Sequence, residues 1–350
     1  MFTLRKLPVS ILLVLVLTLL VSVSVASAAD PAVGGKVTFR DSSGASNSLV
    51  IALTDVPSAG AGNAYEGWLI AGDGSKISVG VLARRADGVI DATYEGTANL
   101  LATYVAFAIS REPSPDPDPA TAGTIVYSDN IPAGAVTTVR GLVVDGSATA
   151  LRAQAQLALT HANLAKTSAT LADKQSHAQH VVNIIDGLGA PGDGTGVLAH
   201  AATVAAAANA LAGKATDTRV AAAANEVAAG ANNTAALATR ARDAAQRLVN
   251  ATVDNITVAL ELENVVNLAS AAVNGTDENG DGINGNVGAE AGGNGTYTLA
   301  QDIAAFEPQA GADLAKPDTG DWTIPVLALL ALVAGAGLTL GGLTVRRNAA

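Results

Sequence analysis

Residues 65–82 read YEGWLIAGDGSKISVGVL, and this stretch sets the fold of the N-terminal third of the chain. Two runs rich in β-branched and aromatic side chains, residues 65–70 and 77–82, flank the turn-forming pair Asp73-Gly74, as in a β-hairpin. Similar runs recur at residues 50–54, 105–109 and 124–127. Because turns rather than helices separate these runs, residues 29–145 are predicted to form an antiparallel β-sandwich.

The same stretch resembles the extracytoplasmic, C-terminal domain of RskA-type anti-sigma-K factors. Those domains carry a Tyr-Glu-x-Trp-Leu strand, a turn, a second strand with a buried glycine, and a later strand that ends in Glu-Pro. The corresponding elements here are residues 65–69, Asp73-Gly74, Gly80 and Glu112-Pro113. The resemblance implies the fold of an outer domain, in which we expect Trp68 and Phe107 to anchor the core between the two sheets.

The regulatory part of RskA-type factors has no counterpart in this sequence. Those factors place an anti-sigma domain, often zinc-binding, in the cytoplasm ahead of a single membrane span. Here a secretory signal stands at that position, and the chain has no cysteine for a thiolate zinc site. The resemblance therefore implies the fold of residues 29–145 and not the regulatory activity. Regulation of a sigma-factor pathway is kept as an alternative function.

From Ser147 the apolar residues recur at about 3.6 residues instead of two, and alanine becomes abundant. Residues 146–273 are predicted to form an antiparallel helical bundle, because alanine favours helix and lets helices approach closely. The expected helices span residues 148–185, 197–212, 217–248 and 253–273, and the Gly/Pro-rich segment 187–194 ends the first. With a C-terminal transmembrane helix, the predicted fold class is α+β multidomain.

All four histidines of the chain lie in this helical region. His177 and His180 are three residues apart and share one helix face, and His200 lies about one turn into the next helix. An antiparallel hairpin brings these three side chains to the same height. They form a candidate site for zinc, copper or haem iron, with Asp173 orienting His177. The alternative is histidines on solvated faces or at helix ends.

Residues 274–322 are predicted to form an acidic, glycine-rich stem, since they hold nine acidic residues and one basic residue. Within them, residues 277–282 read DENGDG and resemble the start of an EF-hand or dockerin calcium loop. The candidate calcium ligands are Asp277, Asn279 and Asp281. Gly288 stands where such a loop has its closing glutamate, and Glu290 follows two residues later. A flexible stem without a metal is the alternative.

The two ends of the chain predict a single-pass type I topology. Residues 1–28 have a basic start, an apolar stretch and an Ala-Ser-Ala cleavage site, as in a secretory signal peptide. Residues 323–345 are uncharged and long enough to span a bilayer, and the Arg-Arg pair in residues 346–350 places this tail in the cytoplasm. The bulk of the chain is then extracytoplasmic, at the cell membrane or cell surface.

A short motif before this span suggests a second mode of anchoring. Pro317, Thr319 and Gly320 resemble an LPxTG-type sorting signal, which sortases cleave after the threonine, although Lys316 stands where that family has leucine. A plain membrane anchor with a Pro/Gly linker is the alternative. The expected partners are therefore the membrane, cell-wall or envelope components, and a sortase.

Composition excludes several classes of function. Without cysteine there is no disulfide, iron–sulfur cluster or cysteine nucleophile, and a net charge of −11 argues against nucleic-acid binding. The sequence contains no nucleophile elbow, phosphate loop or HExxH motif, so we predict that the protein is not an enzyme. The leading hypothesis is a non-enzymatic surface or envelope protein with a structural, binding or sensing role. A metal- or cofactor-binding helical domain, holding a transition metal or calcium, is the alternative.

Overall fold

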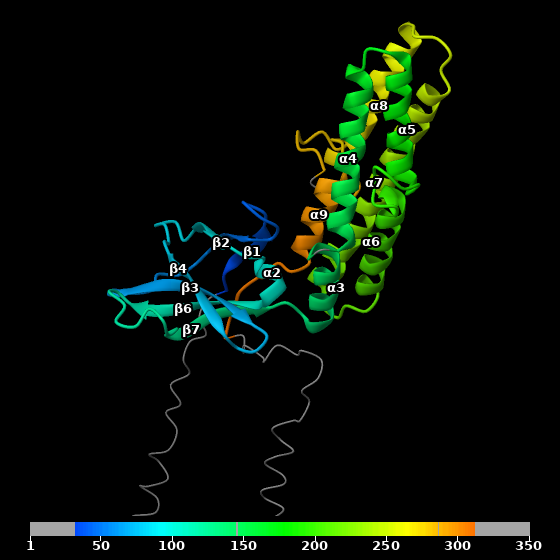
Figure 1. The fold of residues 1–350 in the computed structure, drawn as a ribbon. Coiled ribbons are helices and arrows are strands. Elements are labelled where there is room, and N and C mark those ends of the chain that lie inside the picture. The colour runs from blue at the N-terminus through cyan, green and yellow to red at the C-terminus, as the bar shows by residue number, and fades with distance from the viewer. Residues whose placement is uncertain (1–31, 145, 286, 312–350) are drawn as a thin grey trace, which may run out of the picture.

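The computed structural model describes residues 32–311, except residues 145 and 286, and these form an α+β fold (Figure 1). A β unit, named here for residues 32–131 and 303–311, contains the strands. Long helices extend away from this unit (Figure 1). The predicted α+β class is confirmed.

The β unit contains two antiparallel sheets. The smaller sheet has the order β1-β2-β5, with strands β1 (Gly34–Arg40), β2 (Ser48–Thr54) and β5 (Ile90–Glu95). The larger sheet has the order β4-β3-β6-β7-β8, with strands β3 (Asn63–Ala71), β4 (Lys76–Leu82), β6 (Tyr104–Pro113), β7 (Thr124–Asn130) and β8 (Gln309–Ala310). A one-turn helix, α2 (Leu100–Thr103), leads into β6. The hairpin predicted from residues 65–82 is confirmed by the pairing of β3 with β4.

Both sheets contribute side chains to one apolar core. Phe39 and Ile51 reach it from the smaller sheet, and Tyr65, Leu69 and Phe107 reach it from the larger one. Each of these side chains is buried. Phe107 is therefore a core residue, as predicted.

Trp68 lies on the other face of the larger sheet, which corrects the prediction that it anchors the core between the sheets. Successive residues of a strand point to opposite faces, so Tyr65 and Leu69 in the main core place Trp68 on the outer face. There it is buried in a small second apolar cluster, and its indole Nε1 donates a hydrogen bond to Ser110 Oγ at 2.8 Å.

Seven helices of the described chain follow β7. They are α3 (Ala133–Val143), α4 (Ser147–Thr167), α5 (Leu171–Asp186), α6 (Gly196–Ala212), α7 (Thr218–Val249), α8 (Ile256–Asn274) and α9 (Gly293–Asp302). Helices α4 to α8 pack against one another in a helical arm, a name used here for residues 147–274. Helix α3 joins this arm to the β unit, and α9 lies against α4 and α7 (Figure 1).

The helix predicted for residues 148–185 is in fact two helices, α4 and α5, which pack against each other as a hairpin. Ser168 is extended (φ −68°, ψ 142°), and the Thr170 side chain accepts a hydrogen bond from the backbone N–H of Asp173. Thr170 is thus the N-cap of α5, and Asp173 lies in its first turn. The apolar spacing continues across this break, so spacing alone does not reveal it.

Alanine lets the helices of the arm approach closely. Buried alanines recur at helical spacing on α4, at positions 155, 158, 162 and 165, and along most of α7. Each buries little area, so stability must come from many such contacts. The long helix α7 provides them, because it packs against α5, α6, α8 and α9.

Helix α8 is, within the described residues, the one helix whose length and composition would suffice to cross a membrane. It packs against α7 and α4, and its buried side chains include Val258, Leu262 and Val265. Other apolar side chains of this helix, Ile256 and Leu260, are exposed. The predicted signal peptide (1–28), transmembrane span (323–345) and tail (346–350) lie outside the described residues.

The chain returns from the helices to the β unit after α9. Phe306 is buried beside Phe39 and Phe107, with ring centroids 5.6 and 6.1 Å away. The backbones of Phe306 and Val37 exchange two hydrogen bonds of 2.8 and 2.9 Å, and β8 pairs with β7. The helices are thus inserted between two strands of one sheet.

This return corrects the prediction of a flexible stem for its described part, residues 274–311. The excess of acidic residues is partly compensated by arginines of other segments. Arg40 of β1 pairs with Asp302 at 2.6 Å, and Arg219 of α7 lies 3.6 Å from Glu307. Buried aromatic side chains, Tyr297 and Phe306, supply the apolar contacts that a stem would lack.

A polar cluster around Asp41 connects the β unit with α4 and α9. The Asp41 carboxylate accepts hydrogen bonds from Ser46 N, Tyr297 Oη and Gln301 Nε2, and it pairs with Arg152 at 2.9 Å. The Arg152 guanidinium also lies over the Tyr297 ring, 3.7 Å from its centroid. Burial alone would raise the pKa of Asp41, but these hydrogen bonds and the charge of Arg152 hold it below its usual value.

A second cluster, around Arg219, connects β7, α7 and the returning segment. Arg219 pairs with Asp129 at 2.9 Å and with Asp217 at 2.7 Å. Asp129 also accepts a hydrogen bond from the backbone N–H of Glu307 at 2.7 Å. The two clusters hold the helical arm to the β unit at separate points.

Replacement of Phe306 by alanine tests the role of the returning segment. We expect Phe306→Ala to lower the free energy of unfolding by about 3–5 kcal/mol, because it leaves a cavity in a closed aromatic core. Denaturant unfolding of the full chain, followed by near-UV circular dichroism, measures this change. The control Gln309→Ala, at an exposed position of β8, should change stability by less than about 0.5 kcal/mol. Equal effects of the two substitutions would contradict the account.

Replacement of Asp41 by asparagine tests the junction between the β unit and the helices. At neutral pH we expect Asp41→Asn to cost about 1–2 kcal/mol, because a charge-assisted hydrogen bond is lost at a part-exposed site. The pKa of Asp41 is lowered in the folded state, so its contribution is complete above the ordinary value of 3.8 and is lost as the pH falls through the folded value. The stability difference between wild type and variant, measured by urea unfolding at several pH values, should therefore shrink in acid. A difference that stays constant down to pH 2 would contradict this assignment.

Candidate functional site

Three histidines meet on the α4–α5 hairpin of the helical arm. His161 lies eight residues before Ala169 and His177 eight residues after it, so the hairpin places them opposite each other. His180 follows His177 on the same face of α5, less than one turn further. The turn at residues 168–170 is therefore what creates the cluster.

The ring nitrogens of the three histidines are close together. His161 Nδ1 lies 3.2 Å from His177 Nδ1 and 3.3 Å from His180 Nδ1. One nitrogen from each ring lies within 4.8 Å of the other two, and all three residues are half-buried. Burial, followed by the proximity of His180 and His177, lowers the pKa of His161.

This arrangement corrects the predicted set of His177, His180 and His200. His200 Nε2 instead lies 2.6 Å from Asp193 Oδ2, in the turn before α6. On a single helix, His161 and His177 would lie far apart along the helix axis. The hairpin instead brings His161 back beside His177. Asp173 contacts Thr170 Oγ1 at 2.7 Å, where it contributes to the start of α5.

The predicted calcium loop is a compact turn. Asp277 accepts hydrogen bonds from the backbone N–H groups of Gly280 and Gly282, at 2.8 and 3.0 Å. Asn279 and Asp281 accept similar bonds from residues two positions further along. The three predicted ligands therefore lie in one loop, and calcium binding by them stays a prediction.

Glu290 is the residue of this loop region that the sequence spacing missed. It is 2% exposed, and its Oε1 accepts hydrogen bonds from the backbone N–H groups of Glu278 and Asn279, at 3.0 and 2.7 Å. The chain between Gly282 and Glu290 contains the extra turn that lets a glutamate two positions late reach the loop. The contact of Glu290 with the loop depends on the fold, because the two segments are brought together by the turns between them.

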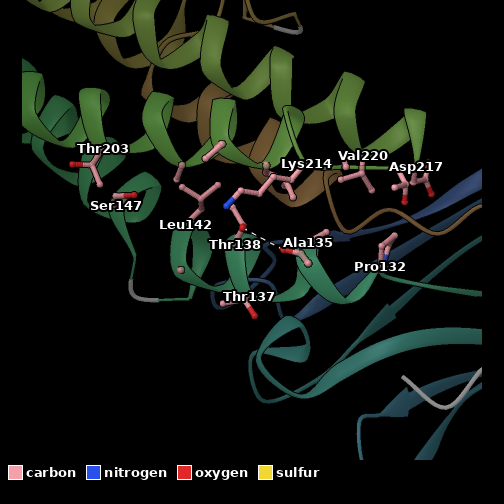
Figure 2. Close-up of a pocket in the computed structure, with 17 residues that line it drawn as sticks. Pro132, Ala135, Thr137, Thr138, Leu142, Ser147, Thr203, Lys214, Asp217 and Val220 are labelled. Atoms are coloured by element: carbon pink, nitrogen blue, oxygen red, sulfur yellow. Dashed lines mark hydrogen bonds between the residues drawn. The ribbon is translucent and has the colours of Figure 1, made fainter. Parts of the chain in front are cut away.

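A cavity of about 600 Å³ lies between α3 and the end of α6 with the following turn (Figure 2). Its lining is mostly apolar, with alanines, Leu142 and Val220, and with the hydroxyls of Thr138 and Thr203. Lys214 and Asp217 are the charged lining residues, and Figure 2 shows the Lys214 side chain directed toward Thr138. A pocket of this size and character suits a small, largely apolar ligand.

Comparison with known proteins assigns the first part of the chain. Residues 20–125 match the family model described as anti-sigma-K factor rskA, C-terminal. The resemblance to the RskA-type domain is confirmed. Among the described elements, the match covers β1 to β6 and ends at the start of β7, before the helices. No curated protein matches the chain, and no solved structure does.

The sorting-signal-like residues Pro317, Thr319 and Gly320 lie outside the described residues. The RskA-type match also ends well before them, at residue 125. A sortase or cell-wall partner therefore receives no support from the comparisons.

Calcium titration tests the predicted loop. If Asp277 ligates calcium, millimolar Ca²⁺ should raise the unfolding temperature of the wild-type protein and not that of Asp277→Asn, because extracellular calcium modules bind at about 0.1–1 mM. Glu290→Ala should lower stability even in EDTA, by about 1–3 kcal/mol, because two buried backbone N–H groups lose their acceptor. Differential scanning calorimetry measures both effects. An unfolding temperature of wild type that does not respond to 10 mM Ca²⁺ would contradict the calcium prediction.

Proposed function

We propose that this protein is a membrane-anchored, non-enzymatic module of the cell surface that binds or senses a ligand outside the cytoplasm. Its RskA-type domain forms most of the β unit, and the helical arm is its binding part. The single observation that carries the proposal is the insertion of the helices into a β unit whose first part matches the RskA-type domain and whose core is completed by Phe306.

The position of the two ends of the described chain supports this arrangement. Residue 32 precedes β1 and residue 311 follows β8, and both strands belong to the β unit. The predicted signal peptide and the predicted span adjoin these two ends in the sequence. A protein anchored beyond residue 311 would hold its β unit toward the membrane and present the arm away from it.

A non-enzymatic role is supported by the composition of the cavity between α3 and α6. Its lining contains one acid, one base and several threonine hydroxyls, and Asp217 is engaged with Arg219 at 2.7 Å. Because Asp217 is held in an ion pair, it is not placed to serve with Lys214 as a general acid–base pair. Such a cavity serves binding better than bond cleavage.

A role in a sigma-factor pathway is the second candidate, and the family match favours it. The matched family is named for anti-sigma-K factors, which associates this domain with regulation. In this second candidate function, the extracytoplasmic part of the protein detects a signal, and a separate regulator in the same pathway responds to it. The sandwich-like β unit and the arm would then form the sensing half of the system.

Protease accessibility in spheroplasts tests the proposed topology. The full chain carries an epitope tag after Ala350, and protease is added from outside. We expect the protein to be cut and a short tagged fragment to survive, because the tail is cytoplasmic. Lysed spheroplasts are the control, in which the tag should also be lost. Full-length protein that survives external protease and is cut only after lysis would overturn the proposal.

Transcript profiling of a deletion strain separates the two candidates. If the protein regulates a sigma-factor pathway, loss of the gene should change one regulon, and the wild-type chain should restore it. An unchanged transcript profile favours the binding module and counts against the regulator.

A further inference from the structure

We propose that His161, His177 and His180 together bind one divalent transition-metal ion, with zinc and copper as the preferred metals. The site goes beyond the proposed surface function, because the three histidines lie outside the RskA-type domain. The match to that family ends at residue 125, whereas the three histidines lie on α4 and α5.

The distances between the nitrogens fit metal coordination. Imidazole nitrogens bind zinc at about 2.0–2.1 Å in tetrahedral geometry, which places two such nitrogens about 3.3–3.4 Å apart. The Nδ1 atoms of His161 and His177 are 3.2 Å apart, and those of His161 and His180 are 3.3 Å apart. These two separations match the edge of a coordination tetrahedron, and the ligand nitrogens of His177 and His180 lie within 4.8 Å of each other.

Hydrogen bonding alone does not account for the same contacts. A ring nitrogen of a neutral imidazole is either a donor with one hydrogen or an acceptor with one lone pair. His161 Nδ1 faces two other ring nitrogens, so at most one of the two contacts is a well-formed hydrogen bond. Lone pairs that converge on one cation would satisfy all three nitrogens at once.

The chemistry of the donor set suits a transition metal. Three imidazoles without a thiolate suit zinc, copper or nickel better than magnesium or calcium. Three protein ligands leave a fourth position for water or a small anion, as in open zinc sites.

The hairpin holds the ligands in place before a metal arrives. Thr170 caps α5 beside the turn, and Gln175 Nε2 donates hydrogen bonds of 2.8 Å to the carbonyl groups of Val249 and Ala251 at the end of α7. Lys174 also pairs with Asp254 at 2.6 Å. Since the first turns of α5 are tied to the end of α7 and to the loop before α8, little ordering of the ligands is left for the binding step.

Metal titration of the full chain tests this site. The protein is purified in detergent without a polyhistidine tag, stripped with EDTA, and titrated with Zn²⁺ or Cu²⁺ by isothermal calorimetry. We expect one ion per chain, with no comparable binding of Mg²⁺. His161→Gln should weaken Zn²⁺ binding by at least about 100-fold, which exceeds the 10–100-fold typical of lost outer-shell partners. The matched control His200→Gln, which changes a histidine paired with Asp193, should bind as wild type does.

Two further measurements keep the result interpretable. Far-UV circular dichroism reports whether each variant keeps its helices, and the paramagnetic resonance spectrum of the Cu²⁺ complex reports nitrogen ligands directly. We expect coupling to three nitrogens in the wild type and fewer in His161→Gln. The proposal is overturned if wild type binds no stoichiometric ion, if folded His161→Gln binds as tightly as wild type, or if His200→Gln loses binding equally. These outcomes leave the proposed membrane topology untouched, because that topology is tested in cells.

Discussion

The packing of Phe306 beside Phe39 and Phe107 is the contact on which the rest of the structure depends. It comes from a segment that follows all the helices, yet it lies in the core of the β unit. Because Phe306 also exchanges backbone hydrogen bonds with Val37, the returning segment lies beside β1. The helical arm is therefore an insertion with two fixed ends.

The two fixed ends of the helical arm connect it physically to the β unit, so a change in the arm could be transmitted to the strands. The Asp41 cluster ties α4 and α9 to the end of β1, and the Arg219 cluster ties α7 to β7. Helix α4 carries both Arg152 near its start and His161 further along. A ligand that repositioned the α4–α5 hairpin would act on an element that directly contacts the β unit. In this way one continuous helix carries both a histidine of the cluster and the arginine that pairs with Asp41 of the β unit.

Local patterns predicted the elements well, and long-range contacts account for the differences. The alternation and turn at residues 65–82 were sufficient for the β3–β4 hairpin, and the Gly/Pro cluster ending at Gly194 was sufficient for the end of α5. The break at Ser168 was missed, because serine and threonine do not interrupt apolar spacing as glycine and proline do. Its one local sign was Thr170 with Asp173, a capping pattern, and that break decides that His161 rather than His200 joins His177. Phe306 and Glu290 carry no local signature of their contacts, since their partners are distant in sequence or depend on the shape of a loop.

Hydrogen exchange of the native chain tests the central claim most directly, because it reports backbone hydrogen bonds without altering a residue. In the described structure the amides of Val37 and Phe306 bond to each other's carbonyl groups. If the helices are an insertion into one closed β unit, the amide of Phe306 should exchange as slowly as amides in the central strand β3, and both should open in one cooperative step. Fast exchange at Phe306 together with full protection of β3 would contradict the account, because the β unit would then be complete without the returning segment.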